Sequence, residues 1–314
     1  MKKLAVLASV LPLLAMPVLA RQYGPIVVDD WSGKFVVTSK GVPAGVAANV
    51  AQLAAPVAPT PADIVWQSAP HNNWDTASQV VINGKPYYPE SAEKPYSIQI
   101  AKNTTADLTR FEIRHGDLWT QALGGNDSER AELDGYASLF SAGQDFWFAY
   151  DLKAENGVPW IAGAPGGGQG GPGAWLTLGQ IHGKGNASAV PWGLSGKGEK
   201  FRITTQTGAQ VEKVHWTSPK IVRDKIYRIV GRINISGNRA VDSSLDVWVD
   251  GVQVVNFVGK IGDVDPKYYF KFGCYRGWEN EGLPTMAFQY ANVVQGTASL
   301  LSRVTSPPPW PGVK

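Results

Sequence analysis

Short runs of alternating apolar and polar residues recur along most of this chain, and Gly, Asn, Asp or Pro separates them. Alternation with a period of two places apolar side chains on one face of a strand and polar side chains on the other. The segments that fit are 97–101, 109–114, 130–133, 146–153, 175–182, 201–205, 226–235, 245–256, 268–275 and 285–293. Hardly any window has helical periodicity, so the pattern predicts an all-β sandwich or jelly roll.

Two loops stand out between these runs. Asp250-Gly251 divides one alternating run, and Asp-Gly suits the positive φ angles of a two-residue hairpin turn. Segment 163–173 reads GAPGGGQGGPG, which predicts a low-complexity loop rather than a phosphate-binding one, because prolines interrupt it and no helix follows. We leave open whether this loop covers a binding surface or only joins two strands.

The ends of the chain differ in amino-acid composition from its middle. Residues 1–20 have a basic start, an apolar stretch and a small-residue end, which predicts a secretory signal peptide and export to the periplasm or the extracellular space. Residues 21–62 form an Ala/Pro-rich lead-in segment, residues 63–305 the main β domain, and residues 306–314 a Pro-rich tail. No later run is long enough to span a membrane.

Charge and composition narrow the choice of partners. The net charge is +3, with no basic run of the kind that binds nucleic acid or a membrane surface, although a mild positive bias suits an anionic partner. The chain has 12 Trp and 11 Tyr, and exposed aromatic faces are common platforms for sugar rings. Cys274 is the single cysteine, so no internal disulfide forms. We expect a monomer.

Three of the predicted strands carry polar residues on one face. Gln180 and His182 share a face in one strand, and Arg130 and Glu132 do so in another. In the third strand Tyr269, Lys271 and Tyr275 share a face, while the opposite face carries Phe270, Phe272 and Cys274 and is expected to be buried. A solvated outer face would also alternate in this way. Such groups are nevertheless costly to align unless they meet at a functional site.

These segments resemble the motifs of jelly-roll polysaccharide lyases. Family 7 alginate lyases carry Arg-(Ser/Thr)-Glu-Leu-Arg, Gln-(Ile/Val)-His and Tyr-Phe-Lys-x-Gly-x-Tyr. Here Arg-Ala-Glu-Leu-Asp stands at 130–134, Gln-Ile-His at 180–182 and Tyr-Phe-Lys-Phe-Gly-Cys-Tyr at 269–275, in the same order. With Arg-Phe-Glu-Ile-Arg at 110–114, the wider pattern is more similar to the heparin-lyase-I-like superfamily, which includes the glucuronan lyases of family 20.

The resemblance implies a β-jelly-roll sandwich of two antiparallel sheets with a concave substrate groove, and β-elimination on a uronate-containing polysaccharide. Arg130, Gln180 and His182 are then expected to neutralise the uronate carboxylate. Tyr275 is expected to give a proton to the glycosidic oxygen and, for a syn geometry, to remove the sugar proton as well. His182 is the alternative base, preferred for an anti geometry.

The remaining expected substrate-binding residues have weaker grounds. They are Lys271, Tyr269, Glu132, Arg110, Arg114 and Arg276. Glu132 is expected to orient Arg130 or to form a structural ion pair. For Arg110 and for Arg114, substrate binding and structural ion pairing are equally expected.

One position departs from the alginate-lyase motif. Asp134 stands where those enzymes have a second arginine, which favours glucuronan or a related glucuronate polymer over alginate or heparin-like glycans. No cofactor is expected, because the four histidines lack ligand spacing; a structural calcium ion is left open. The alternatives are a glycoside hydrolase on the same fold, which needs two placed carboxylates, and a non-catalytic carbohydrate-binding protein.

Overall fold

The structure is a computed structural model, and the chain divides into two compact units, Met1–Ala58 and Pro59–Lys314. In the first unit the structure describes three short antiparallel strands, β1 (Leu4–Leu7), β2 (Ile26–Val28) and β3 (Lys34–Val37), in the order β1-β3-β2. The described residues of the second unit are 64–68, 79–102, 107–120, 128–156, 176–185, 189–197, 199–208, 211–276 and 285–311. The loop predicted at 163–173 lies outside them. The predicted signal peptide at 1–20 stays a prediction.

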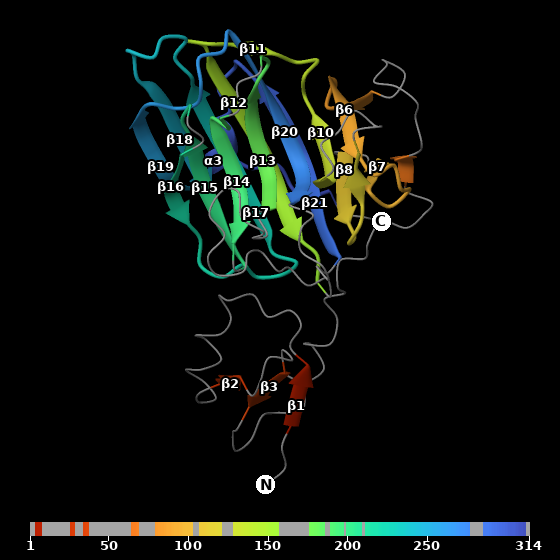
Figure 1. The fold of residues 1–314 in the computed structure, drawn as a ribbon. Coiled ribbons are helices and arrows are strands. Elements are labelled where there is room, and N and C mark those ends of the chain that lie inside the picture. Colours follow the sequence, from red (N-terminus) through yellow and green to blue (C-terminus); the bar gives the residue numbers. More distant parts are fainter. Residues whose placement is uncertain are drawn as a thin grey trace. The chain divides into compact units, whose positions relative to one another are not determined.

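Two antiparallel sheets make up the second unit (Figure 1). The strands of sheet 1 are β5 (Val80–Ile82), β6 (Lys85–Ser91), β9 (Leu118–Trp119), β10 (Ser128–Asp134), β11 (Phe140–Ser141), β13 (Leu176–Gly183), β14 (Trp192–Lys197), β15 (Lys200–Gln206), β16 (Glu212–Thr217) and β20 (Lys267–Arg276). Their order is β16-β15-β14-β13-β20-β10-β6-β5, with β9 beside β10 and β11 beside β20.

Sheet 2 packs against sheet 1. Its strands are β4 (Ile64–Gln67), β7 (Ile98–Lys102), β8 (Asp107–Ile113), β12 (Asp145–Ala154), β17 (Ile226–Asn234), β18 (Ser243–Val249), β19 (Val252–Gly259) and β21 (Met286–Gly296), in the order β19-β18-β17-β12-β21-β8-β7-β4. The predicted fold class, a β-jelly-roll sandwich of two antiparallel sheets, is confirmed. Among the described residues no helix is long and apolar enough to cross a membrane.

The predicted hairpin is present, and its turn has the expected backbone. Asp250 and Gly251 have φ angles of 51° and 81° between β18 and β19. Positive φ at both central residues is the signature of a type I′ turn, whose twist matches that of the two strands.

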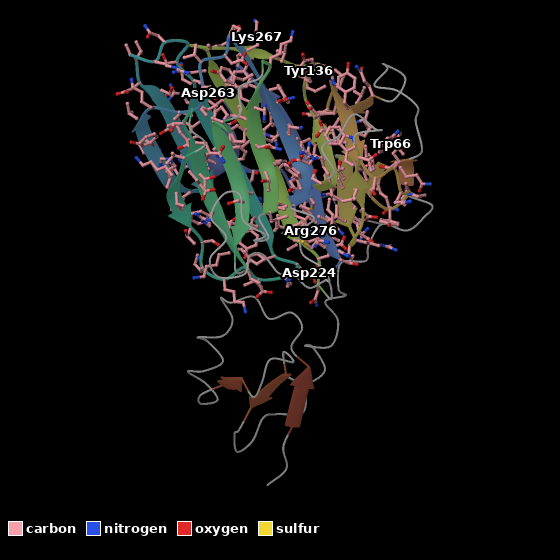
Figure 2. The ribbon with its side chains drawn as sticks, in the orientation of Figure 1. Trp66, Tyr136, Asp224, Asp263, Lys267 and Arg276 are labelled. Atoms are coloured by element: carbon pink, nitrogen blue, oxygen red, sulfur yellow. The ribbon has the colours of Figure 1, made fainter. Side chains whose placement is uncertain are left out.

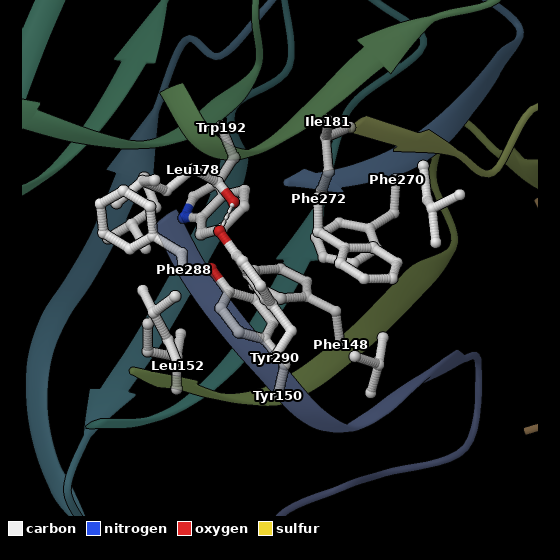
Figure 3. Packing of buried hydrophobic residues seen from close by; sticks show 14 of the residues in the cluster. Phe148, Tyr150, Leu152, Leu178, Ile181, Trp192, Phe270, Phe272, Phe288 and Tyr290 are labelled. Atoms are coloured by element: carbon white, nitrogen blue, oxygen red, sulfur yellow. Dashed lines mark hydrogen bonds between the residues drawn. The ribbon is translucent and has the colours of Figure 1, made fainter. Parts of the chain in front are cut away.

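Aromatic side chains from both sheets fill the core (Figure 3). Phe270 of β20 stacks on Phe148 of β12 at 5.3 Å between ring centroids. The Tyr290 hydroxyl of β21 lies 2.6 Å from the Leu178 carbonyl oxygen and 2.9 Å from that of Gly273. Buried aromatic area stabilises the sandwich, and the Tyr290 contacts fix β21 against β13 and β20 of sheet 1.

A β-bulge interrupts the pairing of β13 with β20. Thr177 is opposite Tyr275, but the next described pair is Gly179 with Phe272, so the register shifts between them. The bulge lets Leu178 point into the core while Thr177 and Gln180, three residues apart, both face away from it. Strict alternation would have placed Leu178 on the same face as Gln180.

The C-terminal segment lies against the outer face of sheet 2. Leu300 and Val304, the latter in helix α3 (Ser302–Thr305), pack on Trp147, and Trp310 packs on a small apolar cluster that includes Leu108. Trp310, in the described part of the predicted Pro-rich tail, therefore packs on the β domain. The boundary after residue 305 stays a prediction.

Candidate active site

Three neighbouring strands of sheet 1, β13, β20 and β10, bring the sequence-predicted residues together on the face that points away from the core. The register places Arg130 of β10 opposite Tyr275 of β20, and Lys271 of β20 opposite Gln180 of β13. His182 lies opposite Tyr269. Pairing of β13, β20 and β10 thus assembles motifs that are far apart in the sequence. We call this surface the polar face of sheet 1.

Glu90 of β6 joins the two cations of this face. Its Oε2 atom accepts a hydrogen bond of 2.6 Å from Arg130 Nη1 and another of 2.6 Å from Lys271 Nζ. Burial alone would raise the pKa of Glu90, but the charges of Lys271 and Arg130 outweigh it and lower the pKa to about 2. Glu90 is therefore ionised and holds both cations in place.

Asp134 has the opposite electrostatic situation. It lies 3.3 Å from Lys271 Nζ and shares a hydrogen bond with Glu90. Burial raises its pKa to about 7; the charge of Lys271 opposes this effect, and the charge and hydrogen bond of Glu90 add to it. Of these two hydrogen-bonded carboxyl groups, Asp134 therefore carries the proton near neutral pH.

Glu132 is completely buried and accepts hydrogen bonds from the Gln180 amide at 3.0 and 3.2 Å. Burial raises its pKa. It lies 3.6 Å from Arg130 Nε, so it borders both residues. The expectation that Glu132 orients neighbouring side chains fits this geometry; direct contact with a polymer does not, because the side chain is covered.

Arg130 lies between two aromatic rings. Its Cζ atom is 3.6 Å from the Tyr275 ring centroid and 4.7 Å from that of Trp119. Stacking on aromatic faces suits a planar guanidinium and restricts its orientation. The Arg130 guanidinium lies against one face of the Tyr275 ring, and Tyr275 is partly exposed.

His182 is half-buried, and its Nδ1 atom lies 3.1 Å from the Gly183 carbonyl oxygen. A carbonyl oxygen accepts only, so Nδ1 carries the proton in this contact and Nε2 is left as the basic nitrogen. Burial lowers the pKa of His182 below its usual value of 6.5. The ring is therefore neutral near pH 7 and suited to accept a proton.

Tyr269 extends the polar face beyond His182. Its ring lies 5.8 Å from that of His182 and 5.3 Å from that of Tyr136, which follows β10. Burial raises the pKa of Tyr269, so its hydroxyl stays protonated.

Three predicted binding residues lie elsewhere. Arg110 belongs to β8 of sheet 2 and pairs with Glu155 at 2.8 Å and Glu112 at 2.5 Å; Arg114 follows the same strand and pairs with Glu112 at 2.6 Å. Arg276 is 1% exposed and forms a buried ion pair with Glu129, on the core side of β20. These three side chains serve structural ion pairs, which corrects the expectation that they bind substrate.

The two cations of the polar face are paired with carboxyl groups. Glu90, Glu132 and Asp134 surround Arg130 and Lys271. The predicted concave groove stays a prediction. Among the described residues, no group of three or more His, Cys, Asp or Glu side chains could hold a metal ion.

Glu90 escaped sequence reasoning because its strand is atypical. Pro86 and Pro89 in β6 argue against a central strand. A signal was nevertheless present: Asn83-Gly84 precedes β6, and these residues have φ angles of 47° and 74° in a tight turn between β5 and β6.

The fold has known counterparts. No family model and no curated protein matches the chain. The endo-β-1,4-glucuronan lyase from the fungus Trichoderma reesei matches with a TM-score of 0.50 at 12% identity, over 74% of this chain and 94% of that one. A family 7 alginate lyase, A1-II′, in complex with product matches with a TM-score of 0.46 at 13% identity, over 65% and 84%. At these identities the likeness concerns the fold, and this chain has the fold of the glucuronan lyase.

Proposed function

We propose that this protein is a polysaccharide lyase that cleaves a uronate-containing anionic polysaccharide by β-elimination. The observation that carries the proposal is the arrangement of Arg130, Lys271, His182 and Tyr275 on one face of neighbouring strands. The fold it shares with a glucuronan lyase supports the same class of reaction.

The chemistry requires three tasks. A base must remove the proton next to the carboxylate, donors must stabilise the negative charge that develops, and an acid must protonate the leaving glycosidic oxygen. Arg130 is suited to the second task, because among the described residues its guanidinium donates one hydrogen bond, from Nη1. Lys271 adds a second positive charge beside it.

We propose that two residues share the proton transfers. We assign the base to His182, although the sequence favoured Tyr275 for the syn geometry of glucuronate and His182 first as a donor to the carboxylate, because the neutral ring presents Nε2 as a basic nitrogen. Tyr275 is half-buried above Arg130 and serves as the acid toward the leaving oxygen. Gln180 positions rather than neutralises, because its amide group donates to Glu132.

A glycoside hydrolase is disfavoured by the same carboxylates. Hydrolysis needs two carboxyl groups roughly 5–9.5 Å apart on opposite sides of the bond. Glu90 and Asp134 share a hydrogen bond, and both contact Lys271 Nζ. Glu132 is fully buried under Gln180. None of these pairs leaves room for a sugar between its members.

We propose glucuronan or a related glucuronate polymer as the substrate, in preference to alginate. The support is Asp134, which occupies the position of the second arginine of the alginate-lyase motif and is turned toward Lys271. A panel of polyuronates tests this: the ultraviolet absorbance of unsaturated uronate ends should rise fastest with polyglucuronate. A faster rise with alginate would contradict the preference.

Two substitutions test the division of roles. His182→Ala and Tyr275→Phe should each lower kcat at least about a hundredfold, the contribution usual for general acid–base groups. Retention of full activity by either variant would remove that residue from the mechanism.

Export to the periplasm or the extracellular space is also a proposal, and it rests on the composition of residues 1–20. The mature protein should begin at Arg21, which N-terminal sequencing of secreted material would show. Recovery of the unprocessed chain from the cytosol alone would contradict export.

A further inference from the structure

Beyond His182 the polar face of sheet 1 continues to an aromatic and basic end. Tyr136 is 40% exposed, and its ring meets the Tyr269 ring edge-on at an interplanar angle of 74°. Lys184, two residues after His182, is exposed, and its Nζ atom lies 5.5 Å from the Tyr136 ring centroid. Figure 2 shows Tyr136 and Lys267 at one end of the strands and Arg276 at the other.

Hydrogen bonds fix the backbone at both residues. The Tyr136 amide donates to Asp134 Oδ1 at 2.7 Å, and the preceding Gly135 amide donates to the Phe270 carbonyl at 2.9 Å. A Cβ at Gly135 would lie 2.6 Å from that carbonyl oxygen, so glycine permits the close approach. The Lys184 amide donates to the Lys267 carbonyl at 2.8 Å, which extends the pairing of β13 with β20.

Two exposed lysines, Lys184 and Lys267, lie at this end. Among the described residues Lys184 forms no ion pair, and Lys267 donates to the hydroxyl of Ser141 at 2.8 Å rather than to a carboxylate. Asp265 is 3% exposed, and its carboxylate accepts from the amides of Gly185 and Lys267. Unlike Arg130 and Lys271, the lysines here are thus available to an external anion.

An exposed tyrosine face beside an available ammonium group has a specific chemical complement. The apolar face of a sugar ring would cover the Tyr136 ring, while a carboxylate on that sugar would meet Lys184 Nζ. A neutral sugar satisfies only the ring, and a small anion only the lysine. A uronate satisfies both.

We propose that Tyr136 and Lys184 form a second uronate-binding subsite, which takes a sugar of the polymer beyond the one bound at His182. This subsite rests on the proposed lyase function and deepens it, because it requires a substrate with a further carboxylate along the chain. It makes Lys184 and Tyr136 determinants of substrate specificity outside the catalytic cluster.

The chain offers a matched control pair on sheet 2. Lys225 Nζ lies 4.4 Å from the Tyr227 ring centroid, but Lys225 also pairs with Asp250 at 2.7 Å, and the Tyr227 hydroxyl accepts from the Val222 amide. Lys225→Gln removes the same charge as Lys184→Gln without touching the polar face of sheet 1.

The experiment compares steady-state kinetics of the two variants on polyglucuronate. Lys184→Gln should raise KM roughly threefold to tenfold with little effect on kcat, as expected for a partly exposed ion pair. Its KM should also depend less on salt, while Lys225→Gln behaves as the unmodified protein. Tyr136→Ala should raise KM similarly, and Tyr136→Phe, which keeps the ring, should not.

A second polymer isolates the carboxylate. On polyglucuronate whose carboxyl groups have been partly reduced to alcohols, the difference in KM between Lys184→Gln and Lys225→Gln should shrink. Equal KM values for these variants on the intact polymer would overturn the subsite while leaving the lyase function standing.

Absence of unsaturated products from the unmodified protein with every polyuronate would instead overturn the proposed function. The subsite is then tested by titrating polyglucuronate into the same variants, and equal Kd values for Lys184→Gln and Lys225→Gln would overturn it independently.

Discussion

At the scale of single residues, the chemistry of the polar face depends on which donor is already engaged. Alternation along the strands predicted that Gln180 and His182 share a face, and the structure places them so. It could not predict that the Gln180 amide is held by Glu132, or that a carbonyl fixes the proton of His182 on Nδ1. Those contacts arise between strands and from local backbone geometry, which a residue pattern does not contain.

The paired carboxyl groups predict a pH dependence. Below about 7, its raised pKa, Asp134 is protonated, and above that value it adds a negative charge beside Lys271. An anionic polymer then binds less well, so KM should rise as the pH increases through about 7.

On the acid side kcat should fall below pH 6.5, as His182 takes up a proton at its lowered pKa. Separate pH profiles of kcat and KM check the fall in kcat and the rise in KM. Asp134→Asn should abolish the rise in KM. A KM that is constant through about pH 7 in the unmodified protein would contradict this role of Asp134.

Glu90 is predicted to hold the two cations of the face. Glu90→Gln should lower kcat/KM at least about tenfold and destabilise the fold by about 2 kcal/mol or more, because it leaves Arg130 and Lys271 without their shared anion. Glu112→Gln is the matched control, since Glu112 is a buried carboxylate between Arg110 and Arg114 on sheet 2. It should lose stability and keep its activity. Urea denaturation and initial rates separate the two effects, and equal activity losses would count against a positioning role for Glu90.

At the scale of elements, the strands with clear alternation were predicted within a few residues. The strand at 130–133, for example, is β10 (Ser128–Asp134), and that at 268–275 is β20 (Lys267–Arg276). Strands without this signature were missed: β6 contains two prolines, and β14 (Trp192–Lys197) contains two glycines. The bulge beside Leu178 was also missed, because it arises from pairing with β20 rather than from the residues of β13.

Gly273 has a physical reason to be glycine within the third motif. Its φ angle is +140°, and an added Cβ would lie 2.3 Å from the Ala131 carbonyl oxygen and 2.7 Å from Glu132 Cα. Gly273→Ala should therefore push β20 away from β10, destabilise the protein by about 2–3 kcal/mol, and separate Arg130 from Tyr275.

A control for Gly273→Ala is Gly143→Ala. Gly143 also has a positive φ, of +73°, but an added Cβ there would meet nothing within 4 Å. It should cost only about 1 kcal/mol. Urea denaturation of both variants measures the difference, and equal losses would show that the contact with β10 contributes nothing.

At the scale of the whole molecule, the C-terminal segment is predicted to stabilise the sandwich from outside. Trp310 packs on the cluster that includes Leu108, and the Arg303 guanidinium donates to the Asn292 carbonyl at 2.8 Å. Trp310→Ala should destabilise the protein by about 2 kcal/mol, less than the roughly 3–5 kcal/mol for a fully buried Trp, because this side chain is partly exposed. Thermal unfolding measures the loss, and activity at low temperature should be unchanged; an unaltered Tm would show that the segment only rests on the sheet.

The two-sheet architecture could be predicted because alternation, turn residues and the order of three motifs agree with one another. Most residues of the polar face could be predicted from the sequence, but the ion pairs between them could not. Arg110, Arg114 and Arg276 were included on residue type, and the structure places each in an ion pair away from the face or on its core side. Which of several arginines reaches a surface is decided by sheet pairing across the whole domain.

If the polar face of sheet 1 performs elimination rather than hydrolysis, the products of the reaction show it directly. Polyglucuronate cleaved in oxygen-18-labelled water, in an incubation short relative to exchange of the anomeric oxygen, should give oligosaccharides with an unsaturated terminal uronate and no label, because elimination adds no water to the broken bond. Mass spectrometry distinguishes these products from saturated ones. Products with a saturated non-reducing end and one oxygen-18 atom at the new reducing end would contradict elimination and identify a hydrolase.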